Sequence, residues 1–188
     1  MAVNTFFEDK VERISDVAVR IATALENAGV PYRVIGGFAI FSYVDQIDPL
    51  KARLTRDIDM MVDRRDLERI ARTVESCGFV YRHVAGADML LDAHEPKARN
   101  AVHLVFAREK VRPEYVEPMP DFSAPARTGH GILLASVADL VRMKLTSFRM
   151  KDRVHIQDMD SVGLITPEIE ASLSDTLRGR LAEVRASE

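Results

Sequence analysis

Two adjacent glycines, Gly36 and Gly37, constrain the fold of this chain most, because they separate two apolar segments of different type. Residues 32–35 before them are short and β-prone, and residues 38–44 after them are apolar enough for a buried helix. Glycine has no Cβ, so its backbone turns tightly and can approach a ligand closely. A helix start also favours negative charge. The pattern predicts a strand, a glycine turn and a helix, with a turn suited to a phosphate group.

An aspartate pair lies on the next predicted strand, residues 56–62. Asp57 and Asp59 are spaced to face one side of this strand, and its apolar residues face the other: Ile58, Met60 and Val62. Carboxylates at positions i and i+2 of a strand project in parallel, and hard cations such as Mg²⁺ prefer oxygen ligands. The pair therefore indicates a metal site. The alternative interpretation is the solvated face of a half-exposed strand.

The other segments predict a small mixed sheet flanked by helices. Thr5 and Glu8 form a capping-box pattern at the start of an amphipathic helix, which Gly29 and Pro31 should end. Apolar spacing predicts another helix over residues 67–77. Further strands are expected over residues 79–84, 87–91 and 101–106. We therefore expect an α/β (α+β) fold.

Four prolines in residues 111–131 exclude a continuous helix or an interior strand there, so this segment is expected to be a Pro-rich connector. It would join a core of residues 1–110 to a C-terminal helical segment, residues 132–188, packed on that core. Ser136 and Asp139 predict the N-cap of a helix that runs towards Met150 and continues in a helical pattern. A terminal helix should follow Thr166-Pro167, with the apolar residues Leu173, Leu177, Leu181 and Val184.

Composition excludes several classes of protein. The 188 residues carry a net charge of -3, so no protein-wide positive field attracts nucleic acid, and any such contact must be local. A single cysteine, Cys77, excludes an internal disulfide framework and a multi-thiolate zinc cluster. The longest apolar-rich stretch, residues 34–44, has about half the length of a membrane-spanning helix. The first residues lack a secretory signal pattern, so we expect a cytoplasmic protein without membrane contact.

One local basic segment lies in residues 142–153, where five cations are opposed by Asp152 alone. If this stretch were one helix, a broad face able to look into a cleft would be shared by Lys144, Phe148, Lys151, Asp152 and His155. A solvated helix surface is the alternative. His155 and Asp158 have the i, i+3 spacing of a metal pair, although such an isolated pair is more often surface decoration.

The order of these motifs resembles the nucleotidyltransferase superfamily that shares its fold with DNA polymerase β, and within it the AbiEii-type abortive-infection toxins. Those proteins carry a Gly-Gly turn, an Arg-x-Ser/Thr-x-Asp-x-Asp segment, and later a helix with a lysine followed by a Lys/Arg-Asp element. The matching residues here are Gly36-Gly37, then Arg53, Thr55, Asp57 and Asp59, then Lys144 and Lys151-Asp152. The resemblance spans roughly residues 30 to 160.

The resemblance implies transfer of a nucleoside monophosphate from an NTP to an acceptor hydroxyl on RNA, such as tRNA, or on a protein. It implies Mg²⁺ held by Asp57 and Asp59, and phosphates received by the backbone amides of Gly36 and Gly37. Lys144, with Lys151 as a second candidate, would supply positive charge to the triphosphate. Arg53 and Thr55 would anchor the loop before the acidic strand or contact phosphate. A toxin role with an antitoxin partner is implied too.

One departure from the family concerns a third carboxylate, which active members place on a later strand. The corresponding strand here is residues 102–106, where His103 occupies that position. An imidazole can act as a general base near neutral pH, but it is a poorer ligand for Mg²⁺. His103 could instead be an ordinary strand histidine, with Asp88 or Asp92 supplying the missing charge.

Two other functions follow from this departure. The first is an inactive nucleotide-binding or protein-interaction module that keeps the fold and has lost the chemistry. The second is a metal-dependent hydrolase that uses Asp57, Asp59 and His103 with a transition metal, which tolerates mixed oxygen and nitrogen ligands better than Mg²⁺ does.

Overall fold

The computed structural model describes residues 2–53, 55, 57–97, 101–128 and 131–187, with side chains from residue 11 onward. Its strands are β1 (Tyr32–Ile35), β2 (Ile58–Val62), β3 (Phe79–Val84), β4 (Ala87–Asp92), β5 (Val102–Phe106), β6 (Ala126–Arg127) and β7 (Leu133–Leu134). Its α-helices are α1 (Ala2–Asn27), α2 (Gly36–Ile47), α3 (Leu67–Glu75), α4 (Val137–Ser147), α5 (Met150–Ser161), α6 (Pro167–Ser172) and α7 (Asp175–Ala186). A 3₁₀ turn, η1, covers Arg64–Asp66.

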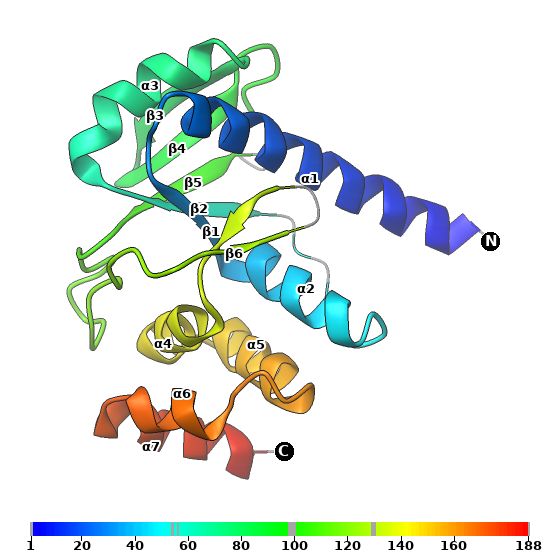
Figure 1. The fold of residues 1–188 in the computed structure, drawn as a ribbon, viewed down its shortest axis with the longest axis vertical. Coiled ribbons are helices and arrows are strands. Elements are labelled where there is room, and N and C mark those ends of the chain that lie inside the picture. Colours follow the sequence, from blue (N-terminus) through cyan, green and yellow to red (C-terminus); the bar gives the residue numbers. More distant parts are fainter. Residues whose placement is uncertain (1, 54, 56, 98–100, 129–130, 188) are drawn as a thin grey trace.

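Within the described residues, the strands form one seven-stranded mixed sheet in the order β3-β4-β5-β2-β1-β7-β6. Figure 1 shows α1 beside α3 at one end of the molecule and α4 to α7 gathered at the other. Helices α4 and α5 pack against α2 and against α7. The predicted α/β fold, with a mixed sheet, flanking helices and a C-terminal helical segment, is confirmed.

The centre of the sheet brings the predicted site residues onto neighbouring strands. β1 runs antiparallel to β2, with Ile35 opposite Asp59. β2 runs parallel to β5, with Asp59 opposite His103. Because Gly36 follows Ile35 directly, the glycine turn, the aspartate and the histidine meet at the same end of three adjacent strands.

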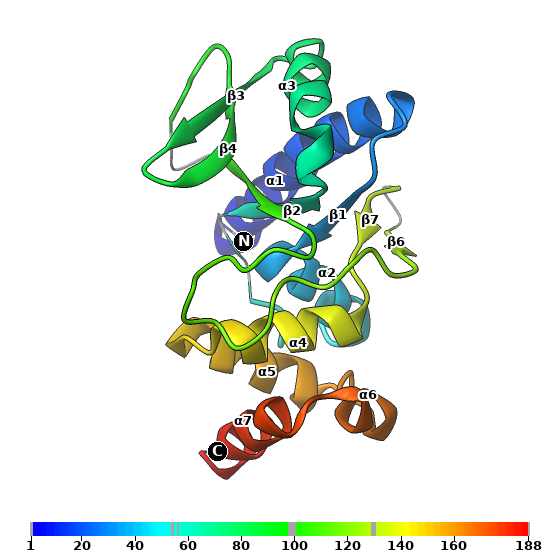
Figure 2. The same ribbon diagram turned by 90° about the vertical axis from the view of Figure 1, so that its left-hand side faces the viewer.

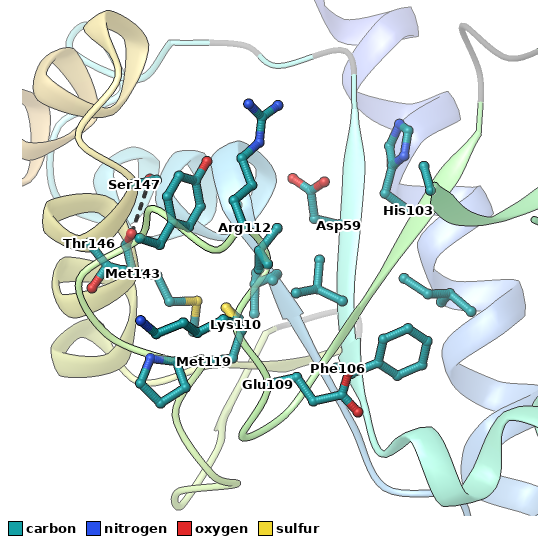
Figure 3. A pocket seen from close by; sticks show the side chains of 18 of the residues that line it. Asp59, His103, Phe106, Glu109, Lys110, Arg112, Met119, Met143, Thr146 and Ser147 are labelled. Carbon is teal, nitrogen blue, oxygen red and sulfur yellow. Dashed lines mark hydrogen bonds between the residues drawn. The ribbon is translucent and has the colours of Figure 1, made fainter. Parts of the chain in front are cut away.

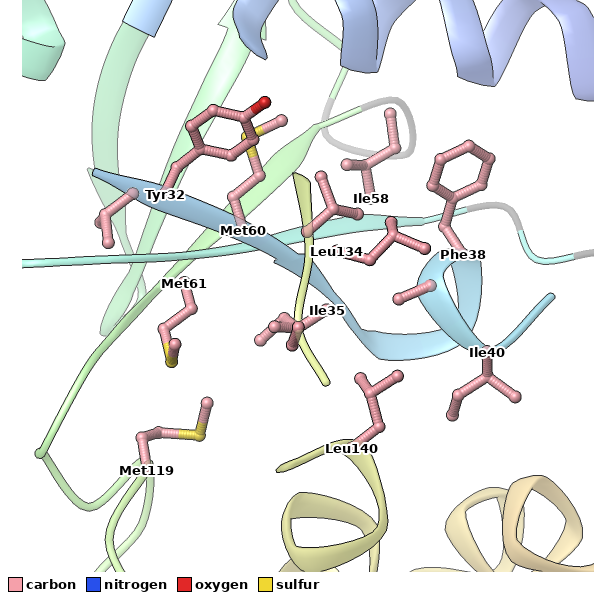
Figure 4. Close-up of a cluster of buried hydrophobic side chains, with 14 of the residues drawn as sticks. Tyr32, Ile35, Phe38, Ile40, Ile58, Met60, Met61, Met119, Leu134 and Leu140 are labelled. Atoms are coloured by element: carbon pink, nitrogen blue, oxygen red, sulfur yellow. The ribbon is translucent and has the colours of Figure 1, made fainter. Parts of the chain in front are cut away.

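Both faces of the central strands are buried. Tyr32 and Met60 lie on one face, and Met61 lies on the other, towards Met119 and Leu140 (Figure 4). Full burial of a side chain of this size stabilises the fold by roughly 1.5–3 kcal/mol. The strand that carries the aspartate is therefore not a solvated edge.

Most predicted elements are found with shifts of a few residues. The strand predicted over residues 79–84 coincides with β3, and Ser136 caps α4 by accepting a hydrogen bond from the Asp139 amide (3.1 Å). Gly29 follows the end of α1 with a φ of +64°. The predicted helix start at Thr5 is wrong, because α1 already begins at Ala2 and a capping pattern permits a start without enforcing one.

The acidic strand is shorter than predicted. β2 begins at Ile58, so Asp57 precedes the strand instead of lying within it, and the predicted first residue, Arg56, lies outside the described residues together with Leu54. Asp57 is held by Thr55: the Asp57 amide donates to the Thr55 hydroxyl oxygen (3.3 Å). The local turn thus competes with strand pairing at this position.

The connector does more than separate two parts. After β5 the chain folds back on itself, since the Arg108 amide donates to the Met119 carbonyl and the Met119 amide donates to the Glu109 carbonyl. It then passes beside α4 and returns to the sheet (Figure 2). There β7 lies parallel to β1, with Leu134 opposite Val34. β6 and β7 were not predicted, because two residues are too few to show a period. The domain boundaries at residues 110 and 131 stay a prediction.

The single helical face predicted through residues 144–155 is wrong. α4 ends at Ser147, and Phe148 has a left-handed conformation with φ 51° and ψ 30° before α5 starts. The Phe148 ring contacts the guanidinium groups of Arg153 and Arg180, at 4.1 and 4.9 Å from the ring centre. These tertiary contacts stabilise a backbone conformation that a non-glycine residue adopts at a cost. No helix in the described part of the chain is long and apolar enough to cross a membrane.

Candidate functional site

A cleft of about 530 Å³ opens between the sheet and α4. Its walls come from the end of β1, from β2 and β5, from the β3–β4 turn, from the connector and from α4 (Figure 3). Among the described residues, four predicted site residues line this cleft: Gly36, Asp59, His103 and Lys144. The other five lie outside its lining: Gly37, Arg53, Thr55, Asp57 and Lys151.

The glycine turn lies directly against the acidic strand. Gly36 has a φ of +70°, and a Cβ placed there would lie 2.0 Å from Oδ2 of Asp59. A Cβ on Gly37 would lie 2.9 Å from the Thr55 hydroxyl oxygen. Ile35, the N-cap of α2, supplies no side-chain cap to the amides at this helix start. Only glycine therefore leaves room for both neighbours beside a helix N-terminus.

Asp59 lies at the centre of the site. Burial raises its pKa above the ordinary value, whereas the positive charge of Lys144 and the neighbouring His103 act in the opposite direction. Asp57, which is exposed, raises the pKa of Asp59 further through its like charge, and Lys151 lowers it. The structure thus brings Lys144, His103, Asp57 and Lys151 within electrostatic reach of one carboxylate.

The donors around Asp59 fit a hard divalent cation. The neighbouring carboxylates of Asp57 and Asp59 supply oxygen ligands, and Asp59 occupies the space that a Cβ on Gly36 would fill. Mg²⁺ usually takes its other ligands from water and phosphates. Within the residues described, no three His, Cys, Asp or Glu side chains are grouped to hold a metal by themselves. The transition-metal site predicted for a hydrolase therefore does not form such a group from its three residues, Asp57, Asp59 and His103.

His103 lies half-buried beside Asp59 on the neighbouring strand (Figure 3). The two acids considered as replacements for the missing carboxylate, Asp88 and Asp92, already have hydrogen-bond partners. The Asp88 carboxylate lines the cleft, but it accepts a hydrogen bond from the Tyr81 hydroxyl (2.5 Å) and contacts His83 Nδ1 (2.9 Å). Asp92 instead accepts from the backbone amides of a turn, at His94 and Glu95.

Lys144 is bound by an acid on the next helix. Its side chain is buried, and Nζ lies 2.9 Å from Oδ1 of Asp152, which is fully buried. The Ser147 hydroxyl and the Arg149 Nε group both donate to Oδ2 of Asp152 at 2.8 Å. Burial opposes ionisation of Asp152, but the Arg149 and Lys144 groups together hold its pKa well below the usual range. Asp152 thus neutralises part of the positive charge of the predicted basic segment, residues 142–153.

Arg53 anchors its loop to α5. Its Nε donates to Oδ1 of Asp158 at 2.8 Å, so the acid of the predicted His155 and Asp158 pair already has a cationic partner. Whether Arg53 also contacts substrate stays a prediction, as do the roles assigned to Thr55 and Lys151. Lys151 is exposed on the first turn of α5.

Comparisons with solved structures identify the architecture. No family model matches the chain, and no curated protein matches it by sequence. A nucleotidyltransferase-like protein from Paracoccidioides brasiliensis aligns over 94% of this chain and 89% of its own, with a TM-score of 0.57 and 17% identity. ANT(2″)-Ia in complex with adenylyl-2″-tobramycin aligns over 92% and 97%, with a TM-score of 0.53 and 12% identity. The chain has the nucleotidyltransferase fold.

A third neighbour, the Megavirus polyadenylate synthase, has a TM-score of 0.52 and 10% identity; 88% of this chain aligns with 36% of that larger protein. In this nucleotidyltransferase fold the last residue of the predicted core and the start of the connector supply residues that the sequence analysis missed. Lys110 and Arg112 are exposed and line the cleft together with Tyr115 (Figure 3). The prolines around them indicated only an extended segment, and nothing in their spacing indicated a cleft wall.

Proposed function

We propose that this protein is a Mg²⁺-dependent nucleotidyltransferase that transfers a nucleoside monophosphate from an NTP to an acceptor hydroxyl. The observation that carries the proposal is the position of Asp59, packed against Gly36 and paired in register with His103. This constellation lies in a cleft of about 530 Å³, in a chain with the nucleotidyltransferase fold. These three residues lie at the same end of three adjacent strands: Gly36 after β1, Asp59 on β2 and His103 on β5. A cluster formed by chance on the surface would not be expected to have this arrangement.

Each residue has a physical role in this proposal. Asp57 and Asp59 hold Mg²⁺, which when bound neutralises phosphate charge and favours in-line displacement. The amides at the start of α2, beside Gly36 and Gly37, receive phosphate oxygens. Lys144 supplies positive charge from a position that Asp152 fixes. The burial of Asp59 fits this assignment, because burial by itself disfavours the charged carboxylate and a neighbouring cation offsets that cost.

His103 takes the place of a carboxylate as the general base. An unprotonated ring nitrogen accepts the proton of the acceptor hydroxyl while the acceptor oxygen forms its bond to the α-phosphorus. The bond from that phosphorus to the pyrophosphate oxygen breaks, and pyrophosphate leaves with its electron pair. The register supports this role, since Asp59 and His103 lie opposite each other on neighbouring strands.

We propose an RNA end as the acceptor, one of the two acceptors that the resemblance implies, and an antitoxin as partner. Two neighbours represent different acceptors: one is a polyadenylate synthase, and the other is bound to adenylyl-2″-tobramycin. Lys110 and Arg112 favour an anionic acceptor. Within the described residues Lys110 forms no ion pair, and the exposed contact of Arg112 with Glu114 is long, at 3.8 Å. Such a pair contributes little, so both cations stay available to phosphate.

The test measures pyrophosphate release and transfer of label from α-labelled NTPs to tRNA, protein and tobramycin, with and without Mg²⁺. Asp59→Asn should reduce transfer by about a hundredfold or more, because it removes a charged metal ligand. Glu75→Gln removes the same charge from an exposed position on α3 and should leave transfer unchanged. Equal transfer by both variants contradicts the proposal.

One observation favours a second candidate, a nucleotide-binding module without chemistry. His103 occupies the strand position beside Asp59 where active relatives carry an acid, and Asp88 is already hydrogen-bonded to Tyr81 and His83. This candidate predicts Mg²⁺-dependent NTP binding without pyrophosphate release with any acceptor. Sustained turnover by the purified protein excludes it.

A further inference from the structure

His155 lies next to the glycine turn and outside the lining of the cleft. Its Cε1 atom is 3.6 Å from the position that a Cβ on Gly37 would occupy, next to the Thr55 hydroxyl at 2.9 Å. The ring therefore lies against Gly37, beside the Thr55 side chain. α5 carries this histidine and packs against α2, which begins at the same turn.

One ring nitrogen of His155 is buried without a partner. Nδ1 is shielded from solvent, and no hydrogen-bond partner meets it among the described residues. Buried polar atoms nearly always have a partner, so such an atom calls for an explanation. In a neutral imidazole one nitrogen donates and the other accepts, whereas in the protonated ring both donate.

The charges facing the ring disfavour its protonated form. Burial is the main cause that lowers the pKa of His155 to about 4, and Lys144 of α4 acts in the same direction. Lys151 and Arg149, at the start of α5, add to the effect, while the Asp152 carboxylate opposes it. α2 presents Gly37 to the ring. Two of these cations, Lys144 and Lys151, are the ones proposed to attract a triphosphate.

Building on the proposed function, we propose that His155 is a further phosphate-binding residue, which takes up a proton and donates a hydrogen bond when a triphosphate occupies the Gly36–Gly37 turn. A bound triphosphate places negative charge among Lys144, Lys151 and His155 and offsets the repulsion that keeps the ring neutral. The proton comes from solvent, so binding consumes one proton and breaks no covalent bond. Proton uptake is largest where the free ring is neutral and the bound ring is protonated, and across that range the charge-assisted hydrogen bond strengthens NTP binding as the pH falls.

The experiment uses the full chain with Mg²⁺ and each of ATP, GTP, CTP and UTP, with inorganic tripolyphosphate as a base-free probe. Calorimetric titration at pH 6 in buffers of different ionisation enthalpy counts the protons taken up. The Cε1–H resonance of His155, followed by NMR from pH 4 to 8 with and without ligand, reports its protonation directly in the unmodified protein. His155→Gln identifies that resonance and cannot be protonated. His94→Gln changes an exposed histidine in the β4–β5 loop and serves as the matched control.

We expect close to one proton taken up at pH 6 by the wild type and by His94→Gln, and clearly less by His155→Gln. The midpoint of the His155 resonance should move upward from about 4 when ligand binds. His155→Gln should bind the ligand about tenfold more weakly at pH 6, with a smaller deficit at pH 8.

Two other results overturn the inference in distinguishable ways. If the wild type binds NTP with Mg²⁺ while the His155 resonance keeps its midpoint and His155→Gln binds equally well at both pH values, His155 has no part in the site and the proposed function stands. If the wild type binds neither an NTP nor tripolyphosphate, the proposed function fails together with the role of His155.

Discussion

Asp59 occupies the space that any side chain at Gly36 would need, because its Oδ2 atom lies 2.0 Å from the position of a Cβ there. The φ of +70° at Gly36 adds a backbone requirement for glycine. A turn and a carboxylate that are 23 positions apart in the chain therefore determine each other's geometry. The placement of the proposed metal ligand depends on glycine as much as on the aspartate itself.

Gly36→Ala should displace the Asp59 carboxylate and abolish Mg²⁺-dependent NTP binding. The positive φ costs roughly 1–2 kcal/mol for a non-glycine residue, and the clash adds to that. Gly163→Ala is the matched control, since Gly163 has a φ of +74° and nothing within 4 Å of its Cβ position. Chemical denaturation and nucleotide titration measure both effects. Equal losses in the two variants would show that the contact with Asp59 is unimportant.

His103→Gln should lower the turnover number by about 10²- to 10⁴-fold, the usual contribution of a general base, and leave NTP affinity close to that of the wild type. The reason is that His103 is proposed to act on the acceptor proton and not on the triphosphate. Steady-state kinetics and calorimetric titration separate the two quantities. Wild-type turnover in this variant would assign the proton transfer to another group.

Asp152→Asn should destabilise the fold by about 3–5 kcal/mol, because it leaves the buried Lys144 ammonium without its counter-charge. Asp175→Asn, at an exposed ion pair with Arg178, should cost less than about 1 kcal/mol. Urea unfolding compares the two. The double variant Lys144→Met, Asp152→Leu should recover much of the loss, and failure to recover would mean that hydrogen bonds to Asp152 matter more than the buried charge.

Stability should fall as the pH is lowered, in two successive ranges. His155 has a pKa of about 4 in the folded protein against an ordinary value of 6.5, so between these values the unfolded chain binds a proton that the folded chain lacks. Asp152 contributes stability above its ordinary pKa of 3.8, and this is lost below that value as the pH approaches its depressed folded pKa. In His155→Gln without nucleotide, the slope of unfolding free energy between pH 6.5 and 4 should be smaller. An unchanged slope would contradict the burial of a neutral imidazole.

The double variant Lys110→Gln, Arg112→Gln should weaken labelling of tRNA and reduce its dependence on salt concentration, while leaving NTP binding unchanged. Each phosphate that is no longer neutralised by a cation of the protein removes about one counterion from the salt dependence. Arg72→Gln, an exposed change on α3, is the control. If tRNA labelling persists while labelling of tobramycin or a protein falls, the acceptor is not RNA.

Much of the local structure follows from short-range patterns. The limits of β3, the cap at Ser136 and the end of α1 before Gly29 depend on neighbouring residues only, so spacing and capping rules predict them. The motif order likewise predicted the fold and placed Gly36 and Asp59 in one site. The caps and apolar spacings behind the local predictions reach only a few residues along the chain, whereas the prediction of the fold came from the order of motifs along the whole chain.

Features decided by distant contacts were not predictable in this way. The helical face predicted through residues 144–155 is interrupted at Phe148, whose ring contacts the guanidinium groups of Arg153 and Arg180. The connector becomes a cleft wall, and β7 pairs with β1, through contacts with no local period.

The amino-acid sequence by itself determined which residue types are present for phosphate and metal chemistry and in which order they occur. Only the tertiary structure decided three contacts. Lys144 forms an ion pair with Asp152, Asp59 pairs with His103 across two strands, and His155 lies against Gly37. The reason is that spacing along the chain sets only the direction of side chains within one helix or strand. Strand register and helix packing set the distances between elements. Those distances determine the partners and the pKa values of buried charged groups.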